Sequence, residues 1–219
     1  MTAEQLISAS IVPLQASDSG DTALEVMAGL HVRHLPVVSG KELLGVISED
    51  ELLNGDTSLS VSGYRPTLSC PFVRHDDHVI EVIRVLTTNE LTAVPVLDDE
   101  QGYLGCVSAD AVLYYFSRMA AFTEPGSIVL LEMNRRDYSL AEIARIAESE
   151  DTLILSSFVR SFQDSSRIEV TLKVNRQDVG GLVAAFQRFN FEVKAYYQEN
   201  GYSDNLRERY NALMAYLNV

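Results

Sequence analysis

The first half of this chain contains the same sequence pattern twice. Residues 33–53 read RHLPVVSGKELLGVISEDELL, and residues 92–113 read TAVPVLDDEQGYLGCVSADAVL. In both, an apolar run entered through a proline is followed by a polar turn and by a second run that contains one glycine and ends in serine. The copies lie about 60 residues apart, and a repeated unit this small cannot bury its apolar face alone. The pattern therefore predicts two similar halves that pack against each other.

Each copy is predicted to fold as helix, strand, strand, helix. Apolar residues upstream of the strands recur at helical spacing; they are Ala23, Val26, Met27 and Leu30 in the first copy and Val79, Val82, Ile83 and Leu86 in the second. The strands are predicted over residues 35–38 and 43–47, and over 94–97 and 103–107. A glycine inside a strand, here Gly45 or Gly105, often marks close approach by a ligand or another backbone. A helix packed against the strand is the alternative.

These residues resemble the two halves of a cystathionine beta-synthase (CBS) domain pair. The resemblance covers residues 10–54 and 69–118 and depends on the Pro-Val-Val strand, the Gly-hydrophobic-hydrophobic-Ser strand end and the helix that follows. CBS pairs of known type bind adenosine compounds in clefts between the repeats. The resemblance therefore implies an adenine nucleoside or nucleotide ligand, such as AMP, ADP, ATP or an S-adenosyl compound, and no obligatory cofactor. The residues expected to line the clefts are Arg33, His34, Leu35, Pro36, Ser48, Glu51, Val94, Pro95, Ser108 and Asp110.

The family pattern after the second strand is Ser/Thr-x-x-Asp, in which the hydroxyl meets phosphate or ribose and the aspartate accepts from ribose hydroxyls. The first copy has Ser48 and Glu51 at these positions, whereas the second has Ser108 and Ala111, and alanine cannot accept a hydrogen bond. Asp110 lies one position early and would point about 100° away on a helix. Both serines also suit helix N-caps, and Ser48 with Glu51 has the spacing of a capping box. Ligand contact and helix capping remain alternative roles for both serines.

The composition favours a cytoplasmic protein with a sizeable core. The chain has 219 residues, of which 47% are hydrophobic and 22% charged, enough for one large or two small domains. No stretch of 18 uncharged apolar residues occurs, and no basic region precedes the first apolar residues, so neither a membrane span nor a secretion signal is expected. Cys70 and Cys106 are too few to indicate a disulfide framework.

Charge is unevenly distributed along the chain. Residues 1–124 carry 18 acidic and 6 basic side chains, whereas residues 125–219 carry 13 and 11. A field this negative repels phosphate backbones, so nucleic acid is not expected as a partner. For the same reason a nucleoside or monophosphate is easier to accommodate than a triphosphate.

A second domain is expected over residues 125–219, after a CBS pair in residues 1–124. Pro125-Gly126 ends a helix and opens a turn. The elements predicted beyond it are a strand at 127–133, a helix at 139–148, strands at 152–162 and 167–174, a helix at 178–189 and a strand at 191–197. The order βαββαβ is the ferredoxin-like arrangement. Residues 204–218 carry apolar side chains at helical spacing and predict an extra amphipathic helix, which covers either its own sheet or a partner subunit.

A βαββαβ unit that follows CBS domains resembles an ACT domain, the small ligand-binding module of amino-acid-regulated enzymes. That family usually has Asp-x-x-Gly in its first strand-to-helix turn, so that backbone amides can approach an amino acid. Here the stretch from Asp137 to Leu140 lacks the glycine, whereas the stretch from Asp178 to Gly181 has it. This departure weighs against an amino-acid site at the usual position.

Neither a metal site nor a catalytic site is expected. The pairs His31 and His34, and His75 and His78, have ligand spacing for a helix, but both lie at junctions where no helical face is formed. The chain contains no Gly-x-Gly-x-x-Gly, Gly-x-x-x-x-Gly-Lys-Ser/Thr, Gly-x-Ser-x-Gly or Cys-x-x-Cys motif.

The sequence thus predicts an α/β (α+β) protein, a CBS pair joined to a ferredoxin-like, ACT-like domain with an extra C-terminal helix. The expected function is a non-catalytic, homodimeric metabolite sensor that resembles bacterial proteins of the acetoin-utilisation type. Its ligand would bridge the two repeats and shift their relative orientation. The alternatives are an oligomeric interaction scaffold with vestigial clefts, and an amino-acid sensor that acts through the ACT-like domain.

Overall fold

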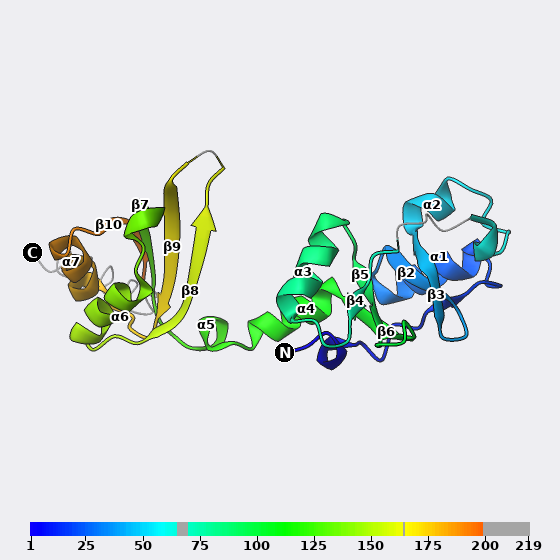
Figure 1. The fold of residues 1–219 in the computed structure, drawn as a ribbon, viewed down its shortest axis with the longest axis horizontal. Helices are drawn as coiled ribbons and strands as arrows, with labels where there is room; N and C mark the ends of the chain where they lie inside the picture. The colour runs from blue at the N-terminus through cyan, green and yellow to red at the C-terminus, as the bar shows by residue number, and fades with distance from the viewer. Residues whose placement is uncertain (65–69, 164, 199–219) are drawn as a thin grey trace, which may run out of the picture. The chain divides into compact units, whose positions relative to one another are not determined.

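The computed structural model describes residues 1–64, 70–163 and 165–198, which form two compact units divided between Ser117 and Arg118 (Figure 1). Each unit has apolar core clusters of its own. The mixed α/β class expected from the sequence is confirmed. The helix predicted over residues 204–218 lies outside the described residues.

The first unit contains two repeats with the same order of elements. The first repeat consists of β1 (Leu14–Gln15), α1 (Gly20–Leu30), β2 (His34–Ser39), β3 (Glu42–Ser48) and α2 (Glu49–Leu53). The second consists of β4 (Val73–Arg74), α3 (Val79–Thr88), β5 (Ala93–Leu97), β6 (Tyr103–Ser108) and α4 (Ala109–Ser117). The short 3-10 helices η1 (Glu4–Leu6) and η2 (Val61–Tyr64) precede and follow the first repeat.

Each repeat forms a three-stranded sheet in which the middle strand pairs with both others. β2 is parallel to β1 and antiparallel to β3, and β5 has the same relations to β4 and β6. The strands β1 and β4 were not predicted, because two residues are too few to show an alternating pattern. The helices α1 and α3 bury the faces that the apolar spacing indicates. Ala23 and Met27 are buried in α1, and Val79 and Val82 are buried in α3.

The two repeats share their packing. The strands β2 and β5 lie in contact, and the core cluster of the first repeat includes Ala93 and Cys106 from the strands of the second. Both side chains are at most 1% exposed. The prediction that the halves pack against each other is therefore confirmed.

The described part of the second unit is one antiparallel sheet with the helices α6 and α7, preceded by the short helix α5. Its elements are α5 (Ala120–Thr123), β7 (Ile128–Asn134), η3 (Arg135–Asp137), α6 (Leu140–Ser149), β8 (Ile154–Ser161), β9 (Arg167–Val174), α7 (Gly180–Arg188) and β10 (Glu192–Tyr197). The strand order is β10-β7-β9-β8, as in the ferredoxin-like fold expected from the order βαββαβ. Alternate residues of β7 are buried, and they form one cluster with Ile143 of α6 and Phe186 of α7. Within the described parts of the chain, no helix is long and apolar enough to cross a membrane.

Candidate functional site

Equivalent main-chain bonds join strand and helix in the two repeats. Glu49 N donates to Arg33 O at 2.8 Å, and Ala109 N donates to Thr92 O at 3.0 Å. Each bond connects the residue at the helix start with the residue just before the middle strand of its own sheet. Arg33 and Thr92 are thus equivalent positions, although their side chains differ in charge and size.

His34 connects the two repeats through a defined hydrogen-bond network. Arg33 N donates to Thr92 Oγ1 at 2.8 Å, and Thr92 N donates to His34 Nδ1 at 3.3 Å. The Thr92 hydroxyl is 3.2 Å from the same nitrogen. Because the backbone N–H can only donate, Nδ1 must accept, which places the ring proton on Nε2. The structure therefore holds His34 as the neutral Nε2–H tautomer.

The electrostatic surroundings of His34 agree with this assignment. Partial burial lowers the pKa of His34 below its ordinary value, and the positive charge of Arg33 lowers it further. The carboxylates of Glu51 and Asp50 act in the opposite direction and raise the pKa, but to a smaller extent. His34 is therefore uncharged at neutral pH and offers its Nε2–H as a donor.

A hollow of about 310 Å³ lies beside His34 and receives side chains from both repeats. Its lining residues are His34, Val46, Ser48, Glu51, Pro71, Asn89 and Leu91. A second hollow of about 210 Å³ shares three of these residues and is lined by Arg33, His34, Ser48, Glu49, Asp50, Asn89 and Glu90. Four of the ten residues expected from the sequence, Arg33, His34, Ser48 and Glu51, thus lie around one pair of hollows.

Ser48 and Glu51 also form the capping box that their spacing predicts. Glu51 N donates to Ser48 Oγ at 3.2 Å, and Ser48 N donates to Glu51 Oε2 at 2.8 Å. The Ser48 hydroxyl donates to the same carboxylate oxygen at 2.8 Å. Capping and cleft lining therefore coincide at these residues, because the N-terminus of α2 itself borders the hollow.

The other expected site residues lie elsewhere. Leu35 and Val94 are fully buried in the middle strands, and Pro36 and Pro95 are buried beside them. Ser108 accepts a hydrogen bond from Ala111 N at 3.1 Å and so caps α4. Asp110 is exposed. None of these six residues lines the two hollows described above.

In the second repeat, the N-terminal segment lies beside both the strand glycine and the position of the missing acid. A Cβ added at Gly105 would overlap Cγ2 of Ile7, and Ser8 N donates to Cys106 O at 2.9 Å. Ile7 and Ala111 both pack against the core cluster of the second repeat. The close neighbour of this glycine is thus Ile7, which directly follows the short helix η1, and the backbone of the same segment bonds to β6. Of the alternatives given for this glycine, approach by another backbone and packing of a helix therefore describe it.

Sequence reasoning missed the part of the cleft that the opposite repeat contributes. Asn89 and Leu91 follow α3, and Pro71 precedes β4, yet all three face the Ser48 side of the first repeat. Their contribution depends on how the repeats pack, which no local motif records. The one usable sequence signal for this part of the cleft was Asn89. This amide side chain directly follows α3, a helix that itself contains no Asn or Gln.

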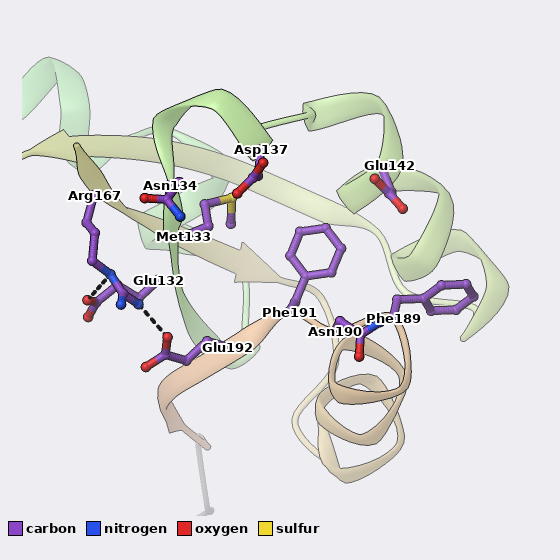
Figure 2. A pocket seen from close by; sticks show the side chains of 10 residues that line it. All are labelled: Glu132, Met133, Asn134, Asp137, Glu142, Arg167, Phe189, Asn190, Phe191 and Glu192. Carbon is purple, nitrogen blue, oxygen red and sulfur yellow. Dashed lines mark hydrogen bonds and ion pairs between the residues drawn. The ribbon is translucent and has the colours of Figure 1, made fainter.

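The second unit has a separate hollow of about 350 Å³ (Figure 2). It lies where β7 runs into η3 and is bordered by Asp137, Glu142, Phe189 and Phe191. Arg167 also lines it, but its guanidinium is paired with Glu132 at 2.8 Å and with Glu192. Arg167 therefore already forms ion pairs with two carboxylates from neighbouring strands.

The cysteines offer no reactive thiolate. Cys106 is fully buried, its Sγ lies 3.2 Å from Val94 O, and burial raises its pKa to about 12. Burial also raises the pKa of the half-buried Cys70 thiol. A thiol with a raised pKa is a poor nucleophile at neutral pH. Among the described residues, no group of three or more His, Cys, Asp or Glu side chains is placed to hold a metal ion.

Comparison with known proteins shows a match to one family model. The model described as "CBS domain" matches residues 3–56 and residues 61–118, which together make up half of the chain.

Several solved structures are also similar to the chain. A CBS domain pair/ACT domain protein from Thermotoga maritima is 20% identical and has a TM-score of 0.48; the match covers 53% of this chain and 96% of that one. CBSX2, solved in complex with AMP, is 24% identical over 52% of this chain and 95% of its own, with a TM-score of 0.46. A CBS domain pair solved with 5-methylthioadenosine and S-adenosyl-L-methionine is 19% identical over 53% and 96%, with a TM-score of 0.45.

Proposed function

Since this chain belongs to the CBS domain family, we propose that it is a regulatory sensor whose first repeat binds an adenosine derivative. CBS pairs are regulatory ligand-binding modules and are generally not catalytic. The observation that carries the proposal is the hollow in which Ser48 and Glu51 of one repeat face Asn89 and Leu91 of the other. A ligand in this position contacts both repeats and so favours one relative orientation of them.

The chemistry of the hollow suits a nucleoside. The Ser48 hydroxyl, the Asn89 amide and the Nε2–H of His34 are donors or acceptors for ribose hydroxyls and ring nitrogens. Val46 and Leu91 supply apolar surface for the faces of a base. The hollow thus combines several convergent polar groups with a smaller apolar surface, and convergent polar groups fix the orientation of a small-molecule ligand.

We propose one working cleft in each chain. In the second repeat, the acid of the family pattern is replaced by Ala111, and Ile7 packs against the same cluster as that alanine. Asp110 is exposed and lies outside the two hollows. The groups that the first cleft offers to a ribose therefore have no full counterpart here.

The second unit is proposed to be an ACT-like domain that receives the signal, with a partner as the alternative receiver. Its ferredoxin-like strand order supports this, and the whole would be a cytoplasmic regulator of the acetoin-utilisation type. A homodimer fits Leu53 and Leu113, which occupy equivalent positions in the two repeats and are 62% and 70% exposed.

A thermal-shift experiment with two matched variants tests the proposal. Adenosine is expected to raise the melting temperature of the wild-type chain with the logarithm of its concentration above Kd. Ser48→Ala and Ser108→Ala each remove a helix N-cap and should each lower the free energy of unfolding by about 1 kcal/mol. Only Ser48→Ala should also abolish the rise produced by adenosine.

Two outcomes would contradict the proposal. If Ser48→Ala keeps the full adenosine-dependent rise, the residue is only a cap and the cleft lies elsewhere. If no adenosine compound changes the melting temperature of the wild-type chain, the scaffold with vestigial clefts is the better description.

A further inference from the structure

Most of the charged side chains that border the cleft of the first repeat are carboxylates. Glu51 lines one hollow, and Glu49, Asp50 and Glu90 line the one that shares its wall. Among the described residues, Arg33 is the single cationic side chain in these two linings. The acidic groups come from both repeats, since Glu90 follows α3 whereas the other three belong to α2.

His34 does not offset this negative charge. Its Nδ1 accepts from Thr92, so the ring that lines both hollows is neutral and carries its proton on Nε2. A neutral donor can bond a hydroxyl or a ring nitrogen, but it cannot balance the charge of a phosphate. The Ser48 hydroxyl is likewise neutral and is already engaged with the Glu51 carboxylate at 2.8 Å.

A phosphate in this cleft would therefore meet more carboxylates than cations. A nucleoside monophosphate carries nearly two negative charges at neutral pH, and like charges repel more strongly in a partly enclosed site than in bulk water. An uncharged ribose substituent avoids this repulsion. A cationic substituent is attracted by the same carboxylates.

We infer that the cleft selects adenosine derivatives whose 5′ substituent is uncharged or cationic, such as a thioether or a sulfonium, over nucleotides that carry phosphate. The inference rests on the proposed adenosine site and adds the chemical class of its ligand. The carboxylates of Glu49, Asp50 and Glu90 repel phosphate and attract a sulfonium, while the neutral donors recognise the parts that all adenosine compounds share.

Isothermal titration calorimetry of the full chain with two matched ligand pairs tests this inference, without divalent cations. Adenosine and AMP differ by the phosphate, and S-adenosylhomocysteine and S-adenosylmethionine differ by the sulfonium charge. At low salt we expect adenosine to bind about tenfold more tightly than AMP, and the difference to shrink at high salt, where charges are screened. S-adenosylmethionine should bind more tightly than S-adenosylhomocysteine.

A double variant locates the effect at the cleft. Asp50→Asn with Glu90→Gln keeps side-chain size but removes one carboxylate from each repeat. The double variant should reduce the ratio of the Kd for AMP to the Kd for adenosine several-fold. Asp110→Asn is the matched control, because Asp110 is the counterpart of Asp50 in the second repeat and is exposed outside the two hollows. Asp110→Asn should leave the ratio of the two Kd values unchanged.

The failures of the two proposals are distinguishable. If AMP binds more tightly than adenosine, or if the double variant and Asp110→Asn change the ratio of the two Kd values equally, the charge selection is wrong while the adenosine site stands. If none of the four compounds binds, the proposed function is wrong and the selection falls with it.

Discussion

His34 combines a structural role and a cleft position in one ring. Its Nδ1 accepts from Thr92 N at 3.3 Å, across the contact between the repeats. The carboxylates of Glu51 and Asp50 and the guanidinium of Arg33 are the charged groups whose influence on the ring is resolved. Protonation would turn Nδ1 into a donor that faces another donor. The contact is therefore compatible only with the neutral ring.

This predicts a pH-dependent contribution of His34 to stability. The folded-state pKa is lowered from 6.5, so between pH 6.5 and that lower value the unfolded chain binds a proton that the folded chain does not. The free energy of unfolding should consequently fall as the pH falls through this window and be fully recovered above it. Urea unfolding of the wild type and of His34→Gln across this range measures the effect, which the variant should lack.

His31→Asn is a suitable control for the loss of a histidine. His31 is exposed at the C-cap of α1 with φ of 55°, a conformation that asparagine tolerates. Its unfolding should follow the wild-type pH dependence. A His34→Gln chain that loses as much stability on acidification as the wild type would contradict the account.

At the scale of elements, the N-terminal segment acts as part of the second repeat. Ala3 N donates to Asp77 O at 2.8 Å, and Ser8 N donates to Cys106 O at 2.9 Å. Between these bonds, Ile7 lies against the Cα of Gly105. The glycine in β6 is thus explained by the space that Ile7 needs.

Gly105→Ala should therefore destabilise the first unit by about 1–3 kcal/mol, because the added Cβ overlaps Ile7. Ile7→Ala should relieve the overlap, so that the double variant is less destabilised than the sum of the two single variants. Gly29→Ala is the control: this helical glycine is exposed with nothing near its added Cβ, and alanine should stabilise it by about 0.5–1 kcal/mol. Urea denaturation measures the free energy of unfolding of the four variants. If the losses of Gly105→Ala and Ile7→Ala simply add in the double variant, the overlap with Ile7 is not the cause of the destabilisation.

The predicted elements were those whose apolar residues show a clear period. The bounds predicted for β7, α6 and α7 agree with the structure to within a residue or two, and the apolar spacing in α3 predicted a helix there, because burial on one face fixes the pattern. The strands β1 and β4 were missed because they are too short to show a period. Of the residues that line the larger hollow, the sequence pointed only to those around Ser48, because Asn89 and Leu91 reach it through tertiary packing.

At the scale of the whole molecule, charge and packing divide the chain at similar places. Most of the net negative charge lies in residues 1–124, and the compact units divide after Ser117. The first unit thus carries both the two hollows and most of the net negative charge. A negative field favours the approach of cations and opposes that of phosphates. The sequence could predict this balance because charges are counted without knowledge of the fold.

The most direct test of the central claim is hydrogen exchange of the full chain, with and without saturating adenosine. Ligand in the first cleft should slow exchange of backbone amides in residues 33–35, 48–51 and 89–92, which come from both repeats and include residues that line the two hollows. Residues 108–111, the counterpart of 48–51, should exchange at the same rate in both conditions. Equal protection of both helix starts, or no protection at residues 48–51 and 89–92, would contradict the account.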